Sequence, residues 1–540
     1  MEFHGKIMNN KENKCNICGR LIGQFGNIEK EQCIFHCDKD EWFDVDENGK
    51  KDWSNSKSKI LQFWEKIQEE IATNISIRFN KIMFPIGNGK EYIPFCNVII
   101  SGNKVKTIGF ERCVFEDEIV ITRLLSPIGI VFENCEFKNS IRIIGKINTL
   151  EFYTCSFFEN LDLGIRECNQ LDFINTTLAP KLLMFNTCTF NCIIYINNDS
   201  FVNSFKCDAV HFNNTVEIKN INIEKSIYIE LCKFNHDLSI QNCTFLKEVS
   251  FKSSNFSNNS DVFINNNKIN ILTIMYIIND SAFFTISDVA VYSGLNLQEG
   301  SLSNFEIHNC NFERAKKTIK NIAFQGNNGF TIFNGVKWGD IRNTFDKTTD
   351  KDTFRQLKYV NEQQGNIIEA NNFYSAEMMT YKEELCINTK PFEKMQDKII
   401  FFMNDIISNF SQNWFLPLLW YFIFGFTFAF LYNSDFVIIN RFSLPAFLFS
   451  IWSFAFFLIE YFKHNNIRIS KILLLLSSSI NYFVNVKNAS WLQLIEFINP
   501  FNTSGLDDNP KRLIWWIIFR MLSVFVVYQF IISLRRQTRR

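Results

Sequence analysis

One short phrase recurs through residues 110–312 and constrains the fold more than any other feature: an aromatic or aliphatic residue, a few polar ones, a cysteine, then Phe two positions later. The pairs are Cys113/Phe115, Cys135/Phe137, Cys155/Phe157, Cys188/Phe190, Cys232/Phe234, Cys243/Phe245 and Cys310/Phe312. Large residues within a phrase lie five apart, and the first three phrases recur every 20 to 22 residues. A repeat of that length is typical of a solenoid, and a five-residue beat matches neither a helix nor an ordinary strand. We therefore predict short extended segments that turn corners and stack as coils, with Phe inside.

The phrase resembles the consensus of the pentapeptide-repeat family, in which Ala, Cys, Ser or Thr stands two residues before a central Leu or Phe. The resemblance covers residues 110–312 and implies a right-handed quadrilateral β-helix. Thr176 before Leu178 and Ser254 before Phe256 keep the repeat spacing with Thr or Ser in place of cysteine. The beat is lost around residues 192–206 and 262–300, where we expect bulges or missing corners.

The recurring cysteines share their position with Thr and Ser, which favours a packing role over a chemical one. Stacked coils lie about 4.8 Å apart, so some cysteine pairs are close enough for disulfides. A reducing compartment would leave all of them as thiols.

A second cysteine pattern, near the start of the chain, predicts a metal site. Cys15-Asn-Ile-Cys18 is followed, after 14 residues, by Cys33-Ile-Phe-His36-Cys37. Two such knuckles suit a tetrahedral zinc ion, with Cys15, Cys18, Cys33 and either His36 or Cys37 as ligands. The pattern is similar to a small zinc knuckle ahead of some membrane-linked pentapeptide-repeat proteins, which implies His36, with Cys37 as the substitute. Four protein ligands leave no open position, so the zinc would be structural; the alternative is unrelated thiols in a disordered leader.

The chain divides into five predicted regions: a zinc-knuckle-like leader (1–45), a capping helix and approach to the solenoid (46–95), the degenerate pentapeptide-repeat β-helix (96–345), a helical connector (346–400) and a transmembrane domain (401–540). Apolar residues at helical spacing over 56–73 predict an amphipathic helix that covers the open first coil, and Phe84 leads into that coil. Gly365, between two helical patterns, predicts a C-cap and therefore a helical hairpin. The sequence of this hairpin resembles the helical connector that precedes the membrane segments in bacterial proteins of this kind.

Long uncharged runs predict four membrane-spanning helices, at about 414–434, 442–462, 470–486 and 512–534. The third is the weakest because it contains Ser477, Ser478, Ser479 and Asn481. Basic residues cluster before the first run, after the second and after the last: Lys390, Lys394, Lys398, Lys463, Arg468, Lys471, Arg535, Arg536, Arg539 and Arg540. The positive-inside rule then places both termini in the cytoplasm of a bacterial inner membrane. The segment Trp491–Pro500 is expected to lie in the interface or to re-enter the bilayer.

Arg520 interrupts the last apolar run. A charge at that depth must snorkel to the interface, face a hydrated cavity, or pair with Glu496, Asp507 or Asp508 on the preceding loop.

Composition and motifs limit the function classes. The chain has 56 basic and 56 acidic residues, so its net charge of zero does not favour nucleic-acid binding. Its six histidines form no His-Glu-x-x-His pair, and there is no phosphate-binding loop, nucleophile elbow or kinase motif. We predict a protein that is not an enzyme, with no catalytic residues, whose partners are the lipid bilayer and another protein or a second copy. Two functions stay open: a membrane-anchored scaffold, or a channel or signal transducer gated by the solenoid.

Overall fold

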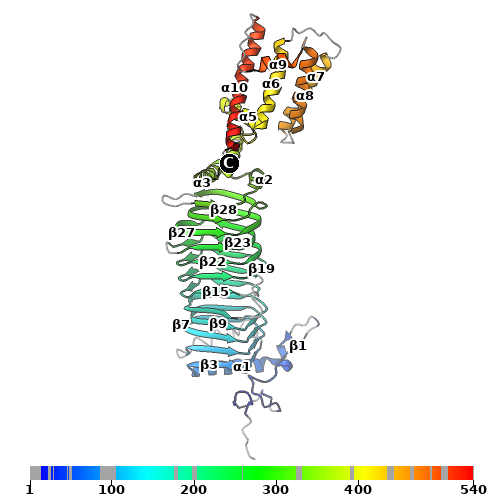
Figure 1. Cartoon of the computed structure of the whole chain (residues 1–540). Helices are drawn as coiled ribbons and strands as arrows, with labels where there is room; N and C mark the ends of the chain where they lie inside the picture. The colour runs from blue at the N-terminus through cyan, green and yellow to red at the C-terminus, as the bar shows by residue number, and fades with distance from the viewer. Residues whose placement is uncertain are drawn as a thin grey trace, which may run out of the picture. The chain divides into compact units, whose positions relative to one another are not determined.

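The computed structural model describes residues 14–21, 26–27, 29–45, 47, 51–85, 105–174, 181–197, 204–257, 260–323, 331–388, 394–433, 443–462, 468–486, 489–499 and 509–538. It consists of two compact units, Met1–Thr349 and Asp350–Arg540. The first holds a β-solenoid over residues 107–334, whose stacked strands are visible in Figure 1, and the second is helical. The predicted fold class is therefore confirmed.

Each coil of the solenoid has four short sides. One coil runs through β18 (Val216–Lys219), β19 (Asn222–Ile223), β20 (Ile227–Glu230) and β21 (Lys233–Phe234). The chain then returns to the starting side, where β22 (Leu238–Gln241) pairs with β18 in parallel. We number the sides first to fourth in this order.

The strands on each side pair in parallel with those of the next coil, as β15 does with β18, β16 with β20 and β17 with β21. The first side contains β3 (Ser76–Asn80), β5 (Thr107–Glu111), β12 (Gln170–Ile174), β15 (Ile194–Asn197), β18, β22, β25 (Val262–Asn265) and β30 (Thr331–Asn334). The second contains β4 (Met83–Phe84), β6 (Val114–Phe115), β8 (Glu136–Phe137), β10 (Ser156–Phe157) and β19. The third contains β11 (Leu161–Glu167), β13 (Leu183–Asn186), β16 (Phe205–Asp208), β20 and β29 (Lys316–Ala323), and the fourth β14 (Thr189–Phe190), β17 (His211–Phe212), β21 and β24 (Asn255–Phe256). Longer strands continue around corners: β7 (Ile119–Glu133), β9 (Ile141–Tyr153), β23 (Thr244–Lys252), β26 (Lys268–Met275), β27 (Ile278–Ser287) and β28 (Ala290–His308).

The corners after the first and third sides share one backbone device. A non-glycine residue there adopts a left-handed conformation, as Thr154 does with φ +51°, and the next residue points inward. That inward residue is Cys155, whose side chain is fully buried. Its thiol donates to the Phe132 and Tyr153 carbonyls, both at 3.4 Å. Other corners use the same inward position for a small donor or an aliphatic residue, namely Cys113, Cys135, Cys188, Val210, Ile221, Cys232, Cys243, Ser254, Asn267, Val289 and Cys310.

The inward Phe residues form stacked columns. On the second side, Phe84, Phe115, Phe137 and Phe157 stack with ring centroids 4.5, 5.1 and 5.0 Å apart. On the fourth side, Phe190, Phe212, Phe234 and Phe256 form a separate column, with spacings of 5.8, 4.8 and 5.0 Å. The sequence phrase treats Phe137 and Phe190 alike, but the structure places them in different columns because their phrases follow different sides of the coil.

Two sequence expectations about the coils need adjusting. The first rung begins earlier than Phe84, because β3 and β4 already pair with β5 and β6. Over residues 262–300 the coils continue, with register shifts between Ile269 and Ile271 and between Asn279 and Phe283, so the expected bulges are present. Thr176, Leu178 and residues 198–203 lie outside the described residues.

Each end of the solenoid is covered by aromatic side chains. Before β3 come η1 (Asp40–Trp42), β1 (Asp44–Val45), β2 (Lys51–Asp52), η2 (Ser54–Ser56) and α1 (Lys57–Thr73). Helix α1 buries Ile60, Phe63, Trp64, Ile67 and Ile71, the residues that the spacing selects. The Phe63 and Trp64 rings contact Phe84 of the first coil at 5.7 and 5.8 Å. At the other end Trp338, just before α2 (Ile341–Thr344), packs on Phe312 and Phe333 at 5.7 and 5.5 Å.

The helical unit begins with the predicted hairpin. Helix α3 (Lys351–Gln363) is capped by the Asp350 carboxylate at the Thr353 amide, and Gly365 follows its C-terminus with φ +74°. Helix α4 (Ile367–Asn388) packs antiparallel to α3: the buried Glu377 carboxylate binds Arg355 Nε at 2.8 Å and Lys358 Nζ at 3.2 Å.

The remaining helices form a bundle: α5 (Met395–Ser408), α6 (Phe415–Asn433), α7 (Ser443–Phe462), α8 (Arg468–Asn485), α9 (Trp491–Ile498) and α10 (Pro510–Thr538). Its core includes Ile407, Trp420, Phe457 and Val526. Among the described residues, two helices are long and apolar enough to cross a membrane, Phe415–Asn433 and Arg512–Arg536, and Leu444–Glu460 is a shorter apolar segment.

We predict that Phe157→Ala lowers the free energy of unfolding by about 3–5 kcal/mol, because it removes a ring from the second-side column. Cys155→Ser keeps a small donor for the Phe132 and Tyr153 carbonyls and should cost far less, whereas Cys155→Ala should cost about 1 kcal/mol for the lost hydrogen bonds. Thermal unfolding of the detergent-purified chain measures all three. A Cys155→Ser variant as damaged as Phe157→Ala would contradict the assignment of this position to a small donor.

Candidate metal centre

Two tight turns bring the candidate ligands together. In the first, Gly19 adopts φ +70° and its amide donates to the Cys15 carbonyl at 2.8 Å. This closes the Cys15–Cys18 loop so that both sulfurs lie on one side. In the second turn, the His36 and Cys37 amides donate to the Cys33 carbonyl at 2.9 and 2.8 Å. Each turn therefore presents two side chains toward the other turn.

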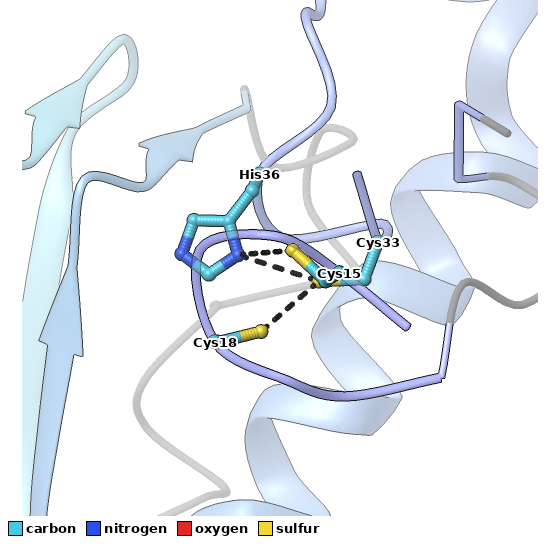
Figure 2. A group of neighbouring side chains, drawn as sticks. All are labelled: Cys15, Cys18, Cys33 and His36. Atoms are coloured by element: carbon cyan, nitrogen blue, oxygen red, sulfur yellow. Dashed lines mark hydrogen bonds between the residues drawn. The ribbon is translucent and has the colours of Figure 1, made fainter. Parts of the chain in front are cut away.

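The four ligand atoms lie close enough to share one ion. Figure 2 shows the three thiols and the His36 ring converging, and all four ligand atoms lie within 4.8 Å of one another. Cys18 Sγ is 3.6 Å from Cys33 Sγ, and His36 Nδ1 lies 3.4 and 3.5 Å from the sulfurs of Cys33 and Cys15. A tetrahedral zinc ion separates two sulfurs by about 3.8 Å and a sulfur from a nitrogen by about 3.6 Å. The donor set and its spacing fit zinc.

The protonation state of His36 also suits a ligand. Burial lowers the pKa of His36, which favours the neutral ring. Its Nε2 lies 2.8 Å from the Asn80 carbonyl oxygen, which can only accept, so the proton belongs on Nε2 and Nδ1 is the acceptor. A metal-binding histidine commonly has a carbonyl on its other nitrogen, where it fixes the ring orientation.

The alternative fourth ligand points elsewhere. The Cys37 thiol is buried and donates to the Ile34 carbonyl at 3.5 Å. The structure thus gathers Cys15, Cys18, Cys33 and His36 and leaves Cys37 outside the group.

Near Cys37, the buried Lys39 ammonium donates to the Phe35 carbonyl at 3.0 Å and lies over the Phe63 ring at 5.1 Å. This lysine fixes the chain just after the second turn, and no sequence motif marks it.

The knuckle is attached to the rest of the first unit. The Phe35 ring meets the Phe63 ring of α1 at 5.6 Å. Arg20, next to the first turn, pairs with Glu70 of α1 at 2.9 Å and lies over the Phe35 ring at 5.1 Å. The site is therefore a folded part of the solenoid's N-terminal end.

The solenoid cysteines have the features of packed thiols. The inward residues of the repeating phrase are all buried: Cys113, Phe115, Cys135, Phe137, Cys155, Phe157, Cys188, Phe190, Cys232, Phe234, Cys243, Phe245, Cys310 and Phe312. No disulfide joins the solenoid cysteines whose side chains are described. Burial raises the pKa of Cys188 and of Cys310 to about 12, so both stay protonated near neutral pH. A buried thiol with a raised pKa is a poor nucleophile.

Arg520 has a partner that the sequence analysis did not include. Its guanidinium donates to the backbone carbonyl of Asn499 at 2.6 Å and lies 3.5 Å from that of Phe497. Both carbonyls belong to the C-terminal end of α9, where a cation is favoured by the helix dipole. Backbone acceptors at a helix end leave no direct mark in the sequence, although Pro500 did mark where this helix stops.

Taken together, these features define a β-solenoid protein with a buried Cys3His cluster that could hold a metal ion such as zinc, and with two candidate membrane helices. No protein-family model matches the chain. Neither a curated protein nor a solved structure matches it.

We predict that the purified, reduced protein carries one tightly bound zinc ion. His36→Ala should weaken binding at least tenfold, because three ligands hold the ion less well than four, whereas Cys37→Ala should leave affinity nearly unchanged. Elemental analysis and competition with a chromophoric chelator measure both effects. Protein without zinc would rule out the site, and the opposite order of the two variants would exchange the ligands.

Proposed function

We propose that this chain is a bacterial inner-membrane protein of the pentapeptide-repeat type, in which four helices anchor a cytoplasmic solenoid that binds another protein. The observation that carries the anchor is an apolar surface on the helical unit. Only 39% of the Phe415–Asn433 window and 28% of the Arg512–Arg536 window are buried. Met521 and Val524 of α10 are 72% and 71% exposed. Lipid is the environment in which such helices are stable.

The two less apolar helices have the same orientation of side chains. Helix α7 exposes Leu448, Ile451 and Trp452. In α8, two of the three serines that weaken its hydropathy are buried, Ser477 and Ser478, and the Ser477 carbonyl accepts from Ser450 of α7 at 3.1 Å. Small polar residues between helices and apolar residues outside are typical of membrane bundles. This arrangement supports four spans and, with the basic clusters, cytoplasmic termini.

The solenoid supplies the interaction surface in this proposal. Its corners, its four-sided coils and a small residue two positions before most Phe residues of the second-side and fourth-side columns support kinship with pentapeptide repeats. Its outer face has both charge signs in neighbouring pairs, such as Arg142 with Asp162 at 3.0 Å and Lys219 with Glu217 at 2.7 Å. A mixed surface of this kind favours a protein partner over nucleic acid.

Two sequence features would favour a channel: Arg520 within an apolar run, and the polar serines of α8. Arg520 binds the end of α9, and the buried Ser477 accepts a hydrogen bond from α7, so contacts within the protein account for both residues. We therefore favour the anchor, and bilayer conductance is the observation that would restore the channel.

Val524→Asp tests the anchor. At a lipid-facing position near the middle of a span, a carboxylate costs about 3 kcal/mol, so the variant should be recovered from membranes at a much lower level than the parent. Leu246→Asp is the matched control, since Leu246 is 61% exposed on the solenoid and should tolerate the charge. Quantitative blotting after carbonate extraction compares them. Equal recovery of both variants would contradict a lipid-facing α10.

Arg520→Leu tests the assignment of Arg520. The change removes the bonds to the Asn499 and Phe497 carbonyls, so we expect the helical unit to lose about 1.5–3 kcal/mol of stability in detergent. Thermal unfolding and planar-bilayer recordings are the measurements. Conductance by the parent that disappears in the variant would assign Arg520 to a pore, and unchanged stability would show that the carbonyl contacts contribute nothing.

A further inference from the structure

The first strand of the solenoid, β3, ends at the carbonyl of Asn80. In later coils the equivalent carbonyl accepts a hydrogen bond from the preceding coil, but no coil precedes β3. At the corner after the first side, the amide of the left-handed residue donates to the carbonyl that ends the first side of the next coil. Lys81 N donates to Glu111 O, Arg112 N to Glu133 O, and Asn134 N to Tyr153 O, each at 2.8 Å. Asn80 is paired with Glu111 in the parallel ladder, so the Asn80 carbonyl is the equivalent acceptor one coil earlier.

His36 occupies the position of that missing amide. Its Nε2 lies 2.8 Å from Asn80 O, the same distance as the backbone bonds of the following coils. The other nitrogen of the same ring, Nδ1, lies among the sulfurs of Cys15 and Cys33. One imidazole therefore contacts both the metal cluster and the open end of the ladder.

We propose that His36 couples metal binding to the capping of the solenoid. Coordination through Nδ1 leaves the ring proton on Nε2, which is the donor that Asn80 O requires, and it holds the ring in place. Metal binding also fixes the turn that carries Phe35. The Phe35 ring packs on Phe63, and the Phe63 ring packs on Phe84 of the first coil. Loss of the metal releases both contacts, so the first coil opens while later coils, held by neighbours on both sides, stay closed.

Hydrogen exchange measured by mass spectrometry on the full-length protein in detergent tests this coupling. Peptides over 76–84 report on the first coil, and peptides over 227–241 report on the middle of the solenoid. Zinc removal with a chelator should speed exchange over 76–84 roughly tenfold and leave 227–241 unchanged, because one bond and its supporting contacts are lost only at the end.

His36→Cys separates the cap from the metal. Four thiolates still hold zinc, so this variant should bind one ion and yet show the faster exchange over 76–84, since cysteine cannot donate to Asn80 O from the metal. His36→Ala should lose both properties, and Cys37→Ala should keep both. Protection over 227–241 verifies that each variant is folded.

Two results would overturn the proposal. If His36→Cys binds zinc and protects 76–84 as the parent does, the imidazole is not the cap. If zinc removal leaves 76–84 unchanged in the parent, metal binding and capping are independent. Neither result bears on the membrane anchor, which is tested by extraction of Val524→Asp.

Discussion

The structure depends on the corners after the first and third sides of each coil, where a non-glycine residue is held in the left-handed conformation. Arg112, Asn134, Thr154 and Asn242 all have φ between +51° and +55°, a state that costs an L-residue about 1–2 kcal/mol. The parallel ladder offsets this cost, because Arg112, Asn134 and Asn242 each donate their amide to a carbonyl of the next coil. Asparagine recurs at the corners since it tolerates this conformation best after glycine.

A ladder of this kind is stable only where a neighbouring coil exists, so its two ends need other partners. At the N-terminal end these are His36 on Asn80 O, together with the rings of α1. At the C-terminal end a buried lysine, Lys317, donates to the Ala315 carbonyl and to Thr344 Oγ1, both at 2.9 Å, under the Trp338 cover. Burial lowers the pKa of Lys317 to about 8, and the charges of Asp340 and Glu313 oppose this shift. Each end thus satisfies its last polar groups with a side chain.

The coils, the inward Phe residues and the ligand set were predictable because each repeats or has a diagnostic spacing. The first rung was not, since Ser76–Asn80 alternates like the later strands but lacks the cysteine–Phe phrase that marks them. The separation of Phe137 from Phe190 was also hidden, because the phrase follows the first side in one case and the third side in the other. The roles of Asn80 and Asn499 could not be predicted at all: both act through their carbonyl oxygens, which every residue has.

Those two carbonyls follow one rule, one of them in the β-solenoid and the other in the helical unit. Asn80 O ends a β-ladder and receives the imidazole of His36; Asn499 O ends helix α9 and receives the guanidinium of Arg520. An unsatisfied carbonyl is costly when water cannot reach it, so a long side chain with a fixed donor is required at each place. In the sequence, His36 and Arg520 both looked like candidates for chemistry: His36 as a metal ligand and Arg520 as a residue facing a hydrated cavity. For His36 the two roles are compatible, because the ring has two nitrogens. Arg520 has only donors, and the α9 carbonyls supply the acceptors for its charge within an apolar helix.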